Sequence, residues 1–239
     1  MDIHKPKPWH SVREFLKEYV IIVVGVLTAL GAEQAVVTVH EHKIANEARE
    51  SIRAEVRENL WWLERREKTQ PCTRQQMVEL GHVLDNARHG RPYPVPRELQ
   101  RVYHAKLTSL RWEANAQAGR ASLFTAQEQQ SLGNMYYTTE QYGRAQDVEE
   151  EVWSKLNAID GLDRLTPQEI DQFATLLAQA RFQSGQVDLN IMRAHQWALA
   201  LRLKGENPNV LEVPVNSVMT VTCPSISATP VATAGGIVH

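Results

Sequence analysis

The sequence lacks the short motifs that mark most catalytic proteins. It contains no HExxH, GxSxG, GxxxxGK[ST], GxGxxG or CxxC segment, which removes the usual signatures of zinc peptidases, serine hydrolases, phosphate-binding loops, dinucleotide sites and thiol redox centres. His40 and His42 flank Glu41, but residues two apart on a helix do not face each other. We therefore expect no catalytic residue, no metal site and no cofactor, and a protein that is not an enzyme.

An excess of basic charge is also missing. The formal net charge is −2 and the sequence pI is about 6.5, whereas nucleic-acid binders normally carry a basic surplus. We expect no nucleic-acid partner. Residues 20–39 include no histidine, which argues against a haem or chlorophyll ligand in that stretch.

The same stretch lacks Lys, Arg, Asp and Pro over twenty residues. A helix rises ~1.5 Å per residue, so this length spans a hydrocarbon core of ~30 Å. We interpret 19–40 as one transmembrane helix. The unbroken apolar run stops at Ala32, before Glu33 and Gln34, which leaves a cleaved signal peptide or a buried soluble helix as alternatives. An apolar run resumes at Ala35 and a long leader precedes the stretch, which favours an uncleaved anchor.

The leader, residues 1–18, predicts an amphipathic segment that becomes helical near Ser11, a good N-cap. Its basic residues precede the apolar stretch, while the long domain that follows counts little in the positive-inside rule. This pattern indicates a cytoplasmic amino terminus and a periplasmic domain from about residue 41. At the membrane interface we expect the aromatic and basic side chains Trp9, Arg13, Phe15, Lys17 and Tyr19.

Small residues recur within the apolar stretch at steps of three and four, so they share one face of the expected helix. Such a face lets a second helix approach closely, although small residues are also common in membrane helices. Glu33 either contacts a proton, an ion or a partner, or reaches the outer interface. The expected contacts with a partner helix are Gly25, Thr28, Ala29, Ala32, Glu33 and Ala35.

The only two cysteines are Cys72 and Cys223. An even pair on the oxidising side of a membrane predicts a disulfide, with two unrelated buried thiols as the alternative.

Strand patterns are hardly in evidence, and the fold class we expect is all-α. Residues 41–68 contain no Gly or Pro, which predicts that the membrane helix continues as a rod until Pro71 ends or kinks it. Further helices are expected over 73–88, 98–110, 125–158, with Gly133 or Gly143 as a break, and 167–204, where Thr166 and Glu169 form a capping box. Residues 41–204 therefore form a periplasmic helical bundle, and 205–239, rich in Val, Thr, Ser and Pro, an extended apolar tail.

Three pieces of the chain resemble a group of bacterial single-pass inner-membrane proteins with helical periplasmic domains. They are WHSVREFLKEYVIIVVGVLTALGAEQAV, RWEANAQAGRASLFTAQEQQSLGNMYYTTEQY and LTPQEIDQFATLLAQARFQSGQV. The resemblance extends to about Cys223 and implies the anchor, the helical fold and a Gram-negative envelope. It implies no activity and no binding residues.

Together these features favour an accessory or scaffolding subunit of a larger bacterial inner-membrane complex, such as a respiratory or photosynthetic one. Its expected partners are the lipid bilayer and other membrane-protein subunits, and a homo-oligomer is compatible with the sequence. The alternative is an envelope sensor or a small-ligand-binding protein whose bundle holds its ligand between helices.

Overall fold

The computed structural model describes residues 12–93, 99, 102–159, 165–206 and 223. Its helices are α1 (Val12–Arg88), α2 (Leu110–Gln117), α3 (Ala126–Asn157) and α4 (Pro167–Leu201), with a short 3-10 helix, η1 (Arg120–Leu123). No strand occurs among these residues. The expected all-α fold is confirmed for the part of the chain that the structure describes.

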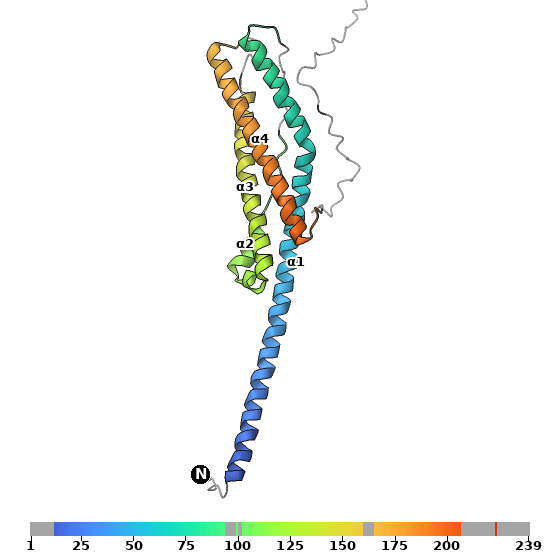
Figure 1. Ribbon diagram of the computed structural model, residues 1–239, viewed down its shortest axis with the longest axis vertical. Coiled ribbons are helices and arrows are strands. Elements are labelled where there is room, and N and C mark those ends of the chain that lie inside the picture. The colour runs from blue at the N-terminus through green and yellow to red at the C-terminus, as the bar shows by residue number, and fades with distance from the viewer. Residues whose placement is uncertain (1–11, 94–98, 100–101, 160–164, 207–222, 224–239) are drawn as a thin grey trace, which may run out of the picture.

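Helix α1 is 77 residues long and has two different environments (Figure 1). Its first half extends away from the other helices, and its second half packs among them. The change comes near Ala45, the first buried residue of α1, and Ala48 and Ile52 continue the buried face. The exposed half contains the one described segment that is long and apolar enough to cross a membrane.

Pro71 was expected to end or kink the rod. An end there is wrong, because α1 continues through Pro71 to Arg88. Proline has no N–H to donate within the helix, yet the residues on both sides of it are buried. Gln70 and Thr73 lie in the core, and Met77 follows one turn later. Burial of this inward face stabilises the helix past the proline, and the expected helix over 73–88 is the last part of α1.

Helices α3 and α4 run side by side, and α4 also packs against α1. The apolar core consists of two clusters. One surrounds Leu60, Met135 and Ile191, and the other surrounds Leu80, Trp153 and Phe173. Each cluster draws residues from α1, α3 and α4, so the bundle is held together along most of its length.

Both long helices of the bundle begin with a capping box. Thr166 accepts a hydrogen bond from the Glu169 N–H and the Glu169 carboxylate accepts one from the Thr166 N–H, as the sequence predicts. Thr125 and Glu128 repeat the arrangement at α3. Helix α3 runs without a break through both of its glycines, so the break considered at Gly133 or Gly143 does not occur.

The helix expected over 98–110 is wrong, since residues 102–109 have no regular secondary structure and α2 begins only at Leu110. The apolar residues of this region still point inward as expected. Leu99 is buried, Val102 packs against the second cluster, and Tyr103 and Leu107 pack against the first. The inward pattern is right, but the backbone follows a different path because side chains of α1 and α3 bind it.

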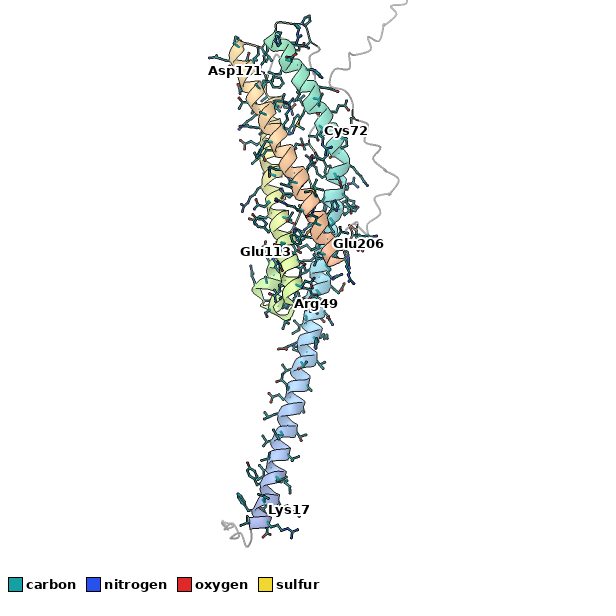
Figure 2. The ribbon with its side chains drawn as sticks, viewed as in Figure 1. Lys17, Arg49, Cys72, Glu113, Asp171 and Glu206 are labelled. Atoms are coloured by element: carbon teal, nitrogen blue, oxygen red, sulfur yellow. A yellow bond between two sulfur atoms is a disulfide. The ribbon has the colours of Figure 1, made fainter. Side chains whose placement is uncertain are left out.

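The end of α4 leads the chain back to α1. The Glu206 N–H donates to the Arg57 carbonyl at 3.1 Å, and Cys223 forms the predicted disulfide with Cys72, 151 residues earlier. Figure 2 labels Cys72 on α1 and Glu206 just after the end of α4, at the end of the bundle nearer the projecting half of α1. The expected extended conformation of residues 207–222 and 224–239 lies outside the described residues, as does the leader before Val12.

Reduction of the disulfide is expected to destabilise the bundle. A cross-link that closes so long a loop restricts the unfolded chain, with an upper estimate of ~5 kcal/mol. The free energy of unfolding of the detergent-solubilised protein, measured by urea titration of the helical circular dichroism signal, should fall by a few kcal/mol in the C72S/C223S double variant. An unchanged urea midpoint would show that the disulfide attaches the C-terminal segment without stabilising the bundle.

Candidate functional site

Residues 102–109, here called the linking segment, lie between α1 and α3 and are held by two amide side chains. Gln146 of α3 accepts from the Ala105 N–H at 2.7 Å and donates to the Ala105 carbonyl at 3.2 Å. Asn59 of α1 does the same with Thr108, at 3.0 Å and 2.8 Å. Each amide therefore makes the two backbone hydrogen bonds that a residue of a neighbouring strand would make in a sheet. The linking segment packs as a fourth element beside α1, α3 and α4, although no sheet forms there.

A buried carboxylate of α1 caps the short helix that follows the linking segment. Glu55 accepts from the N–H groups of Arg111 and Trp112 at 2.8 and 3.1 Å, in the first turn of α2. The Tyr136 hydroxyl donates to the same carboxylate at 2.7 Å. Burial and the neighbouring Glu55 raise the pKa of Tyr136 well above its usual value, so the hydroxyl stays a donor. Because Ser109 provides no side-chain cap, Glu55 stabilises this helix start.

An ion pair crosses the middle of the bundle. Arg66 Nη2 lies 2.9 and 2.7 Å from the two carboxylate oxygens of Glu149, and both side chains are fully buried. Arg66 also donates to the Tyr103 carbonyl at 3.2 Å. Burial raises the pKa of Glu149, and the charge and hydrogen bonds of Arg66 oppose that rise. The pair thus links α1, α3 and the linking segment at one level.

A groove of about 580 Å³ opens between the linking segment and α3. Its size is within the range of small-molecule sites. Charges of both signs line it: Lys106 and Arg144 are basic, and Glu140 and Asp147 are acidic. His104 is at one end, 3.1 Å from a Glu150 oxygen. Arg144 pairs with Glu140, and the lining also includes the apolar side chains of Leu107 and Tyr136, so the groove offers both polar and apolar surface to a ligand.

The described residues contain no group of three or more His, Cys, Asp or Glu side chains placed to hold a metal ion. His40 and His42 lie on the exposed part of α1. The buried Glu55 and Glu149 have their oxygens engaged by protein donors, and these contacts position backbone and helices.

The residues predicted to contact a partner helix all lie on the projecting half of α1 and are exposed: Gly25, Thr28, Ala29, Ala32, Glu33 and Ala35. A Cβ atom added at Gly25 would meet nothing within 4 Å. Of the predicted interface residues, Arg13, Phe15, Lys17 and Tyr19 lie on the first turns of α1, where the Phe15 and Tyr19 rings stack at 6.2 Å. Trp9 lies outside the described residues.

The buried polar residues of α1 are absent from the sequence predictions. Glu55, Asn59 and Arg66 occupy the same inward face as Ile52, Leu60 and Leu63. Their spacing of four and seven residues places them on that face, and this spacing is the feature of the sequence that could have predicted their burial. For Glu55 and Arg66, charge argues for a solvent-facing position, and their burial in the bundle overrides it.

Comparison of the chain with known protein families, curated proteins and solved structures finds no match.

Replacing Gln146 by Leu should loosen the linking segment. The variant leaves the N–H and C=O of Ala105 buried without partners, at a cost of ~1–3 kcal/mol for each group. Amide hydrogen exchange across 102–109 should become faster, and the urea midpoint should fall. The control is Gln130→Leu at an exposed position of the same helix, which should change neither. Unaltered exchange in Gln146→Leu would mean that packing alone holds the segment.

The Arg66 and Glu149 pair should behave as a coupled unit. Arg66→Met or Glu149→Leu alone leaves one buried charge without its partner, which typically costs ~3–5 kcal/mol. The double variant Arg66→Met/Glu149→Leu should be more stable than either single variant, measured by urea unfolding. Additive losses in the double variant would contradict the coupling.

Proposed function

We propose that this protein is a non-catalytic accessory or scaffolding subunit of a larger bacterial inner-membrane complex. In this proposal the projecting half of α1 crosses the membrane, with its amino terminus in the cytoplasm, and the bundle stands in the periplasm. Contacts with other subunits are made by the membrane helix, the bundle and the tail. Respiratory and photosynthetic complexes are assemblies of the kind that would use such a subunit.

One observation supports this proposal most directly. The apolar window of α1 is 0% buried by the rest of the chain, although the same helix becomes a core element of the bundle from Ala45 onward. An apolar helix face of this extent is stable in water only when something else covers it. Lipid and partner helices are the surroundings that suit it.

The continuity of α1 supports a scaffolding role in particular. Because no loop separates the projecting half from the buried half, the bundle keeps a fixed distance and direction relative to the proposed anchor. Arg49 strengthens the junction by pairing with Glu128 at 3.0 Å and contacting the Leu123 carbonyl at 3.4 Å, and Figure 2 shows Arg49 at the end of the bundle nearest the projecting half. A stiff spacer of this kind suits a subunit that positions others.

A ligand-binding function is the second candidate, and the groove beside Lys106 and Arg144 is the observation that favours it. In that case the protein would be an envelope sensor or a small-ligand-binding protein. A ligand-binding protein would not need stable protein partners, whereas a scaffolding subunit would, so co-purification distinguishes the two candidates.

Extraction of native membranes in mild detergent, followed by size separation and identification of co-migrating chains, tests the scaffold proposal. We expect a large assembly with fixed stoichiometry. Gly25→Leu should release the protein from it, because the new side chain separates closely packed helices. A solitary chain in mild detergent would contradict the proposal and direct attention to the groove.

The matched control is Leu27→Phe. Leu27 is 62% exposed on the projecting half of α1, so a larger side chain there does not disturb the bundle. Two residues correspond to about 200° around the axis, which places Leu27 on the side of the helix opposite Gly25. Leu27→Phe should leave the assembly intact. Glu33→Leu adds a second test: loss of the partner identifies Glu33 as a contact, and retention places it at the interface.

A further inference from the structure

The outward face of α4 carries an apolar stripe that nothing in the described chain covers. A helix packed on one side normally presents polar residues on the other. Here Phe182, Met192 and Leu199 are 62%, 51% and 77% exposed. The stripe is defined by Ala178, Phe182, Gly185, Leu189, Met192, Gln196 and Leu199.

These seven positions are separated alternately by four and three residues. Such spacing averages 3.5 residues and keeps the stripe straight along a supercoiled pair of helices, whereas a surface helix of a globular protein repeats near 3.6. A shallow depression lined by Ala174, Thr175, Ala178, Gln179 and Phe182 lies at its first end. The stripe therefore has the geometry of one half of a coiled-coil seam.

We infer that this stripe pairs with the same stripe of a second copy of the chain, in a parallel dimer. The inference rests on the proposed anchoring, because two copies inserted with the same topology present their α4 helices in the same direction. A symmetric pair also needs only one self-complementary surface. Gln196 is the polar position of the seam. It pairs best with Gln196 of the second copy, and this preference fixes the register of the two helices.

The charges beside the stripe favour the parallel arrangement. In a parallel coiled coil, the residue directly before a seam position such as Leu189 lies beside the residue five positions later on the partner helix. Asp188 then faces Arg193 of the second copy, and symmetry makes this ion pair twice. Arg193 forms no ion pair with any described residue, so it is available. Full-length antiparallel pairing would instead bring Asp188 near Asp188 of the second copy, and like charges there oppose association.

The flank of the stripe that carries Asp188 is also engaged with α1. Asp188 accepts from Gln70 at 2.5 Å and from Arg74 at 3.1 Å, one bond to each carboxylate oxygen, and its side chain stays 36% exposed, so Arg193 of the second copy can reach it alongside these donors. On the same flank, His195 lies 3.3 Å from Glu67, and Arg181 donates to the Met77 carbonyl at 3.3 Å. These contacts fix the rotation of α4 about its axis. The stripe is thus held facing outward before any partner binds, which lowers the cost of association.

Cysteine cross-linking of the full-length protein in native membranes tests the dimer. Phe182→Cys and Leu199→Cys are made separately and treated with a short bismaleimide; the native cysteines are paired with each other and do not react. A parallel pair in register predicts a product of twice the 27.1 kDa chain mass from each variant. Tyr137→Cys, equally exposed on α3, should give none.

Each other outcome overturns the inference. Absence of dimer from both variants removes the pairing, and a product only when the two variants are mixed indicates antiparallel helices. A cross-link to a different protein would show that the stripe binds another subunit rather than a second copy of this chain. Met192→Asp in the Leu199→Cys background should reduce the dimer at least tenfold without loss of helical signal. Failure of the anchor is read separately, by recovery of the chain in the soluble fraction.

Discussion

Burial of one continuous face of α1 is the constraint on which the rest of the structure depends. From Ala48 to Leu84 this face contributes to both apolar clusters, and α4 packs directly against it. A helix of 77 residues cannot be stable by propensity alone, since tertiary packing provides most helical stability in proteins. The bundle stabilises only the second half. The first half therefore depends on an environment that the described residues do not supply, and in the proposed function a lipid bilayer supplies it.

The buried face is not uniformly apolar, and its polar members determine how the chain closes around it. Glu55, Asn59 and Arg66 bind backbone groups between Tyr103 and Trp112. A segment without secondary structure would otherwise bury unsatisfied N–H and C=O groups, which proteins rarely tolerate. The linking segment fills the space between α1 and α3 because these side chains, with Gln146, replace the hydrogen bonds of a sheet. Specific recognition of this kind selects one path for the chain.

Periodicity and capping were sufficient to predict much of this architecture. The capping box at Thr166 and Glu169, the length of α3 and the pairing of Cys72 with Cys223 all follow from short-range patterns or from a cysteine count. The helix expected over 98–110 was wrong because its apolar spacing fits a helix, while the competing hydrogen bonds come from Asn59 and Gln146, far away in sequence. The end of the helix considered at Pro71 was wrong for a similar reason: local chemistry allows an end or a kink there, and burial of Gln70 and Thr73 keeps the helix going. The groove and the α4 stripe needed the fold to show which face of each helix is open.

The central claim is that α1 passes as one helix from a lipid environment into the core of the bundle. Single cysteines placed from residue 17 to residue 60, in intact cells with a permeabilised outer membrane, can be probed with a maleimide that does not cross the inner membrane. We expect no labelling across 20–39, labelling at exposed positions such as Glu41, Lys43 and Glu47, and renewed protection at Ala48 and Ile52. Labelling throughout 20–39, or a mature chain that lacks these residues, would contradict it.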